Sequence, residues 1–101
     1  MNEIDFKNWM QKNTVNPKVQ SDTISRLKRL EKELGNIDLD SEFRTDKCNR
    51  ILSLFNKTGK NSEMEQIHPQ NMPIGKYQLS TFKYALKKYI SFLESTLSDN
   101  L

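Results

Sequence analysis

Apolar residues return at the spacing of an α-helix along most of this chain, and this periodicity most restricts what the chain can fold into. The strongest example is "STFKYALKKYISFLE", residues 80–94. Its apolar face consists of Phe82, Ala85, Leu86, Tyr89 and Leu93. No segment shows the sustained alternation of apolar and polar residues that a half-buried strand requires. The pattern predicts an all-α fold, a compact bundle of four or five short helices with one long irregular loop.

Two of the other helices lie in the N-terminal half of the chain. The shorter one has an apolar face made of Phe6, Trp9 and Met10. The linker after it closes at Pro17. The longer helix extends over residues 21–34, where Ser21 or Asp22 is placed to cap its first amides. Gly35 then supplies the left-handed residue with which many helices end.

The remaining helix opens at "LDSEF", residues 39–43, where Asp40 or Ser41 is placed to cap it. Its apolar stripe consists of Cys48, Ile51, Leu52 and Phe55. The segment "NKTG" ends the helix at Gly59, and a break near Thr45 would divide it in two.

Residues 57–78 interrupt the helical pattern. They contain two of the three prolines and two of the three glycines, and no apolar periodicity. Loops of this length are uncommon in compact domains and tend to be functional or disordered. We therefore expect one domain over residues 1–101, with a long loop at 57–78 and a disordered tail at 95–101.

Cysteine content and hydropathy narrow the class of protein. Cys48 is the only cysteine, which excludes an internal disulfide and a cysteine-rich zinc site. The N-terminal residues have no apolar run typical of a signal peptide, and no later segment is apolar enough to span a bilayer. These features predict a cytoplasmic protein without a membrane partner.

Positive charge is concentrated in the last helix. The net charge is +3, and between positions 76 and 93 there are four lysines and no acidic residue. Helical spacing points Lys83, Tyr84 and Lys87 away from the apolar face and puts Lys88 on its flank. Lysines that only keep a helix soluble usually alternate with glutamate, and here they do not. The alternative, a simple solvated face, stays open at this point.

A basic face that carries an aromatic ring is typical of a surface that binds nucleic acid, because lysines neutralise phosphates and rings stack on bases. We expect contacts with double-stranded DNA, mainly through its phosphates. The residues predicted to make them are Lys83, Tyr84, Lys87 and Lys88 in the last helix, Arg26, Lys28, Arg29 and Lys32 in the second, and Lys47, Arg50 and Lys57 with a smaller role.

No catalytic constellation is recognisable. His68 is the only histidine, and it lies in the predicted loop before a proline. Cys48 falls on an apolar stripe and is interpreted as a core residue. Asp38 and Asp40 precede a helix, where capping explains them better than metal binding. The chain is therefore predicted not to be an enzyme and to need no cofactor or metal.

Three segments carry a family resemblance: "FKNWMQKN", "SDTISRLKRLEKEL" and "GKYQLSTFKYALKKYISFLE". Together they resemble the small helical module at the N-terminus of many restriction-type and HNH-type endonucleases and related mobile-element proteins. The pattern is also similar, more loosely, to the SAM-like core-binding domain of tyrosine recombinases. In the last helix it occupies Ser80, Thr81, Ala85, Leu86, Tyr89, Phe92 and Leu93. The resemblance implies a DNA-binding accessory domain that positions a nuclease or recombinase domain outside these residues.

A second function class also fits the sequence. "IHPQNMPIGKY" and three apolar residues off the main stripes, Leu54, Ile90 and Phe92, are able to form an exposed apolar patch or a further layer of packing. An exposed patch would indicate a protein-interaction or dimerisation module, including an inhibitor of a partner protein.

Overall fold

Six α-helices and one short 3₁₀ helix, joined by turns and loops, occur within residues 1–99, which are the residues that this computed structural model describes. They are α1 (Glu3–Lys12), α2 (Pro17–Glu33), α3 (Leu39–Asp46), α4 (Asn49–Ser53), η1 (Asn56–Gly59), α5 (Ser62–Ile67) and α6 (Leu79–Asp99). No strand occurs in this range. The all-α bundle predicted from the sequence is confirmed.

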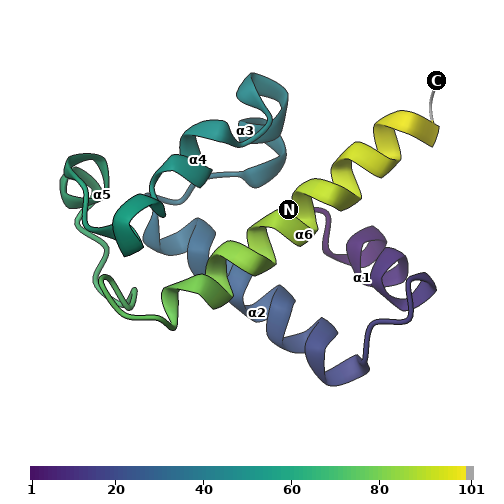
Figure 1. Cartoon of the computed structure of the whole chain (residues 1–101). Helices are drawn as coiled ribbons and strands as arrows, with labels where there is room; N and C mark the ends of the chain where they lie inside the picture. Colours follow the sequence, from purple (N-terminus) through teal and green to yellow (C-terminus); the bar gives the residue numbers. More distant parts are fainter. Residues whose placement is uncertain (100–101) are drawn as a thin grey trace.

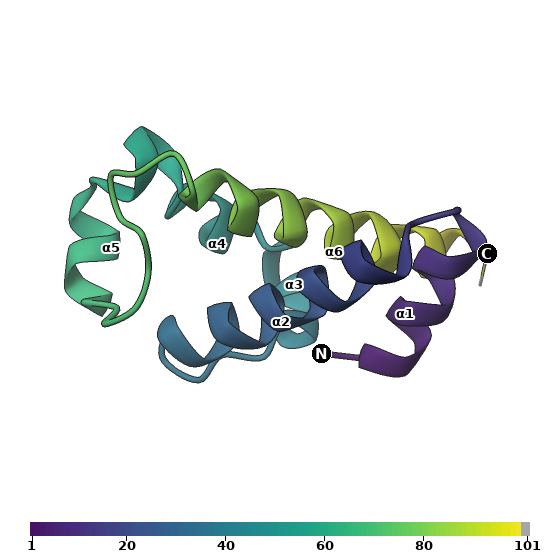
Figure 2. The same cartoon turned by 90° about the horizontal axis from the view of Figure 1, so that it is seen from below.

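The two longest helices, α2 and α6, cross in adjacent layers (Figures 1 and 2). α1 packs against both helices on one side of the crossing, and α3 contacts α6 on the other side. η1 lies against the first half of α6, and α5 occupies the end of the molecule farthest from α1 (Figure 1). α6 therefore contacts α1, α2, α3 and η1, and one of its faces is buried in the core.

The core depends on apolar side chains at helical spacing. Leu27 and Leu30 of α2 and Leu86 and Tyr89 of α6 are all fully buried. Burying one leucine side chain stabilises a fold by roughly 1.5–3 kcal/mol. Cys48 is also fully buried, which confirms that it is a core residue.

Aromatic rings join α1 to α6. The Phe6 ring meets Tyr89 edge-on, with centroids 4.9 Å apart and an interplanar angle of 85°. Phe92 lies 5.4 Å from Phe6 and 5.9 Å from Trp9, and Tyr89 lies 5.5 Å from Phe92. Such edge and tilted arrangements are those that aromatic pairs prefer.

The Tyr89 hydroxyl joins this cluster to two other segments. It accepts a hydrogen bond from the backbone N–H of Asn2 at 2.7 Å and donates one to the carboxylate of Asp40. Burial and the hydrogen bond to Asp40 raise the pKa of the Tyr89 phenol. The hydroxyl therefore stays protonated and links α1, α3 and α6.

The amino group of Met1 is held beside this cluster by two acidic side chains. It donates to Asp38 at 3.1 Å and to Glu31 at 3.4 Å. Burial alone would lower the pKa of the ammonium, but the hydrogen bond to Asp38 and the attraction of Glu31 raise it above 8.0. The same hydrogen bond lowers the pKa of the Asp38 carboxyl.

The start of α2 differs from its prediction. The helix begins at Pro17 and not near Ser21, because Asn16 accepts a hydrogen bond from the backbone N–H of Lys18 at 2.8 Å and caps it. Proline is well suited to the first helical position, where no N–H is needed. The expected end is confirmed, since the helix stops before Gly35, which has a φ of +99°.

The third predicted helix is divided, as expected, but at a different place. Lys47 and Cys48 both adopt the left-handed conformation, with φ of 58° and 64°, and separate α3 from α4. The cap of α3 is Asp38, whose carboxylate accepts from the backbone N–H of Asp40 at 3.3 Å. Asp40 is thereby left to bind Tyr89.

The irregular loop predicted over residues 57–78 is wrong in its first half, because this half forms η1 and α5. Asn61 caps α5 by accepting from the backbone N–H of Met64 at 2.9 Å. The disordered tail is wrong for residues 95–99, where α6 continues to Asp99. Residues 100–101 lie outside the described residues.

Replacing Tyr89 by phenylalanine tests the hydroxyl link. The ring and its packing remain, but the Asn2 N–H and the Asp40 carboxylate each lose a partner. We expect Tyr89→Phe to lower the free energy of unfolding in urea by about 1–3 kcal/mol. Tyr84→Phe is the matched control, since that hydroxyl is exposed, and it is expected to leave stability nearly unchanged. Equal effects of the two variants would contradict the proposed role of the hydroxyl link.

The Met1 ammonium predicts a pH dependence of stability. Its pKa is higher in the folded protein than its ordinary value of 8.0, so the folded state favours the charged form. The contribution is complete below about pH 8 and is lost as the pH rises through the folded pKa. Urea unfolding between pH 7 and 10 is expected to show this loss with a free amino terminus and not with an acetylated one.

Ionisation of Cys48 also changes stability at high pH, but its effect cancels when the free and acetylated proteins are compared. Burial raises the pKa of its thiol from 9.0 to about 12, so this group destabilises the folded state above pH 9 in both proteins alike. Identical pH profiles for the two proteins would show that the ion pairs of Met1 do not stabilise the fold.

Candidate nucleic-acid interface

The outward side of α6 carries Lys83, Tyr84, Lys87 and Lys88, which we call the α6 basic face. Phe82, Leu86 and Tyr89 are buried on the inner side, so Tyr84 and Lys87 are exposed, while Lys83 and Lys88 are half-buried on the flanks of this outward side. The Tyr84 side chain is 57% exposed, which confirms that it faces water while Tyr89 lies in the core. No acidic residue occurs in α6 before Glu94.

The lysines of this face are not neutralised by neighbouring carboxylates. The ion pairs found within residues 1–99 join Met1 to Glu31 and Asp38, Lys28 to Glu3, and Arg50 to Glu42. None involves a lysine of α6. The positive charges of the face therefore remain available to a ligand.

Lys88 and Tyr84 form a local pair on this face. The Nζ atom of Lys88 lies 5.4 Å from the Tyr84 ring centroid and donates to the Tyr84 hydroxyl at 3.3 Å. Attraction between a cation and the negative face of a ring orients both groups. The pair keeps the tyrosine ring close to a positive charge at the surface.

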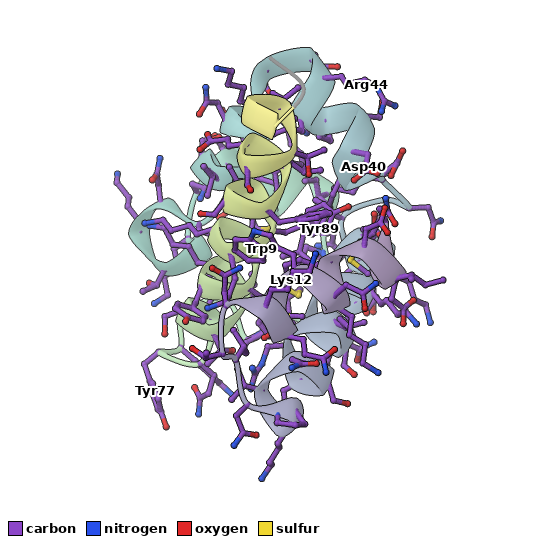
Figure 3. All side chains as sticks on the ribbon, turned by 90° about the vertical axis from the view of Figure 1, so that its right-hand side faces the viewer. Trp9, Lys12, Asp40, Arg44, Tyr77 and Tyr89 are labelled. Carbon is purple, nitrogen blue, oxygen red and sulfur yellow. The ribbon has the colours of Figure 1, made fainter. Side chains whose placement is uncertain are left out.

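A shallow groove of about 270 Å³ runs beside this pair, lined by Trp9, Tyr84, Lys87, Lys88 and Ser91. Trp9 reaches it from α1, and Figure 3 shows its side chain between α1 and α6. The tryptophan ring stacks on Phe6 at 6.1 Å. The α6 basic face thus has a rigid aromatic border, which the charge pattern alone did not predict.

The predicted residues of α2 have varied surroundings. α2 and α6 pack against each other (Figure 2). Lys28 is paired with Glu3 at 3.0 Å, Lys32 is exposed on the outer side of α2, and Arg26 is half-buried on its flank. Lys28 is therefore engaged by an acidic residue of α1, unlike the lysines of α6.

Arg29 is occupied by structural contacts. Its guanidinium donates to the backbone carbonyl of Asn71 and lies 5.9 Å from the Phe82 ring centroid. Glu33 accepts from the backbone N–H groups of Gln70 and Asn71 at 3.0 and 3.3 Å. The Asn71 side-chain amide also donates to Glu33, at 3.0 Å. This bond makes the largest contribution, and together with the two backbone bonds it lowers the pKa of Glu33. Together Arg29 and Glu33 hold the segment after α5 against α2.

Two of the three residues assigned a smaller role have other surroundings, and Lys47 lines a hollow that also includes Leu97, near the end of α6. Arg50 forms an ion pair with Glu42 at 2.6 Å, and Lys47 is the left-handed residue at the end of α3. Lys57 is different, because it precedes Thr58, which lines a pocket together with Lys83. Only Lys57 is placed to extend the basic surface of α6.

This pocket was not predicted from the sequence. It has a volume of about 410 Å³ and lies at the start of α6. Its lining residues are Phe55, Thr58, Tyr77, Leu79, Ser80 and Lys83. The Tyr77 side chain at its rim is 79% exposed and projects from the molecule (Figure 3). Two segments far apart in the sequence, 55–58 and 77–83, build the pocket, so no local motif marks it.

The groups with catalytic or metal-binding chemistry do not gather in the described range. The Cys48 thiol is buried with a pKa raised to about 12 by burial, and His68 is exposed at the end of α5. Residues 1–99 contain no cluster of three His, Cys, Asp or Glu side chains suited to a metal ion. No helix in this part of the chain is long and apolar enough to cross a membrane. The chain matches no family model, no curated protein and no solved structure.

Arg29→Ala tests whether Arg29 is structural. Loss of its bond to Asn71 and of its contact with Phe82 is expected to lower the free energy of unfolding by about 1 kcal/mol. Amide hydrogen exchange in residues 68–78 should become faster. Lys32→Ala on the same helix is the control and is expected to change neither measurement. An Arg29 variant as stable as the parent would indicate that its contacts contribute nothing to the fold.

Proposed function

We propose that this chain binds nucleic acid, foremost duplex DNA, by placing phosphates on the α6 basic face. One observation carries the proposal: Lys83, Lys87 and Lys88 project from one side of one helix beside Tyr84, without an acidic partner. Each phosphate neutralised by a lysine releases condensed counterions, and this release drives binding.

The kinds of residue on this face favour phosphate contacts over sequence recognition. Lysine is a point charge and lacks the planar fork with which arginine reads guanine. Arg29 and Arg50 have partners within the fold, so neither is free for such a role. We infer that binding is only weakly dependent on base sequence.

The arrangement of α6 also favours an approach to the phosphate backbone. One side of the helix is in the core, and α1 borders the exposed side through Trp9. Lys83 and Lys87 lie one turn apart, roughly 6 Å along the helix axis. The resemblance to the helical modules of endonucleases and recombinases adds the proposal that this binding positions a separate catalytic domain.

Three of the residues that suggested a protein-interaction module do not support that alternative. Leu54 and Phe92 are buried, and Ile90 packs against the core, so these residues form a further layer of packing and not an exposed patch. The large aliphatic side chains exposed in the described range, Ile4, Val19 and Leu97, lie on three different helices.

Reversing two charges tests the proposal. Lys87→Glu combined with Lys88→Glu is expected to abolish DNA binding in fluorescence anisotropy while leaving thermal stability nearly unchanged. With three phosphates neutralised, the parent should show a slope of log K against log salt of about −3.

The matched control is Lys18→Glu combined with Lys32→Glu, which makes the same change in net charge on α2. Both of these lysines are exposed. This variant is expected to keep most of the affinity. Equal losses in the two double variants would mean that net charge, and not the α6 basic face, determines binding.

A further inference from the structure

We propose that the pocket at the start of α6, here the Tyr77 pocket, binds an unpaired base of the nucleic acid whose phosphates lie on the α6 basic face. The pocket is formed by Phe55, Thr58, Tyr77, Leu79, Ser80 and Lys83. The inference rests on the proposed function and specifies which form of DNA the site prefers.

The walls of the pocket suit a flat aromatic ring. Phe55 and Leu79 are 4% and 2% exposed and supply the apolar surface, while the Tyr77 ring stands exposed at the rim. The volume of about 410 Å³ lies within the usual range for small-molecule sites. Bases stack on exposed aromatic side chains with little regard for their identity. No lining residue is acidic, so an anionic strand meets no repulsion there.

Two hydroxyl groups of the pocket have acceptor capacity to spare. The Ser80 hydroxyl donates to the Tyr77 carbonyl at 2.7 Å, and the Thr58 hydroxyl donates to the Lys57 carbonyl at 2.6 Å. Each oxygen keeps lone pairs that can accept from an N–H group. The N–H groups of a base are engaged by its partner in a duplex and become available when the base is unpaired. The pocket therefore matches an unpaired base better than a paired one.

Lys83 connects the pocket to the α6 basic face. It lines the pocket and is also the first lysine of the face, with Lys87 one turn farther along. A base in the pocket would place its own phosphate beside Lys83 and leave Lys87 and Lys88 for the next phosphates. The two sites thus form one continuous binding surface.

The pocket is formed by backbone contacts and does not need a ligand to assemble it. The Gly75 N–H donates to the Thr58 carbonyl at 2.7 Å, which fixes the segment leading to Tyr77. Gly59 lies so close to α6 that an added Cβ would be 2.9 Å from the Leu79 Cδ2 atom. Lys57 and Thr58 adopt left-handed conformations that non-glycine residues rarely take.

Three DNA probes test the inference by fluorescence anisotropy: a short duplex, the same duplex with one extra unpaired adenine, and a duplex whose extra nucleotide has no base. We expect the unpaired adenine to bind about tenfold more tightly than the other two. The probe without a base controls for the flexibility of a bulged duplex. Equal binding of both bulged probes would overturn the pocket as the site of the preference.

Variants of Tyr77 test whether the preference for an unpaired adenine arises in the Tyr77 pocket. Tyr77→Ala is expected to remove the tenfold preference and to keep the affinity for plain duplex, and Tyr77→Phe is expected to keep both. Because this side chain is 79% exposed, neither change should affect folding, which circular dichroism checks. A preference that survives in Tyr77→Ala would overturn the inference.

The outcomes for the two proposals are distinct. Binding of all three probes with equal affinity would overturn the base-binding pocket and leave the phosphate-binding face in place. Failure of the parent protein to bind any of them at low salt would overturn both proposals.

Discussion

The side chain of Tyr89 is the contact on which the arrangement of this protein depends. Its ring meets Phe6 and Phe92, and its hydroxyl binds Asn2 and Asp40, so one residue joins α1, α3 and α6. This contact also fixes the rotation of α6 about its axis. Because successive residues of a helix are about 100° apart, burying Tyr89 forces Tyr84 and Lys87 toward solvent. The orientation of the basic face is therefore a consequence of core packing.

The lysines of α6 have no acidic partner, and the contacts made by the acidic residues of α2 and α3 account for this. Most acidic residues of α2 and α3 have structural partners elsewhere. Glu31 and Asp38 bind the amino group of Met1, Glu33 holds the segment at 70–71, Asp40 binds Tyr89, and Glu42 pairs with Arg50. These carboxylates stabilise helix ends and connections on the far side of α6. Because these carboxylates are bound elsewhere, they do not neutralise the lysines, and the surface of α6 stays positive.

Helical periodicity was enough to predict the fold class and the faces of α6, because both depend on spacing within one segment. The division between buried Tyr89 and exposed Tyr84 followed from that spacing alone. The starts of helices were harder to predict, since Pro17 is compatible with a linker and with a first helical turn. Short α5 has too few residues for a periodic signal, and only its Asn61 cap marks it.

The candidate site could be predicted only where it lies within one helix. Lys83, Tyr84, Lys87 and Lys88 share a face whatever the rest of the chain does. Whether Lys28 and Arg29 are free to join them depends on tertiary contacts, and in the fold Lys28 pairs with Glu3 while Arg29 bonds to Asn71. The Tyr77 pocket was beyond prediction because Phe55, Thr58 and Leu79 meet only through the turn at η1.

That turn shows how strain and site are connected. Left-handed conformations at Lys57 and Thr58 cost of order 1–3 kcal/mol each, and Thr58 is β-branched, which makes its conformation especially uncommon. Burial of Phe55 and Leu79, the close contact of Gly59 with α6 and the hydrogen bond from Gly75 offset that cost. These contacts also hold the rim of the pocket before any ligand arrives. A ligand of the proposed kind would therefore lose little free energy in ordering the site, because the walls of the pocket are already held in place.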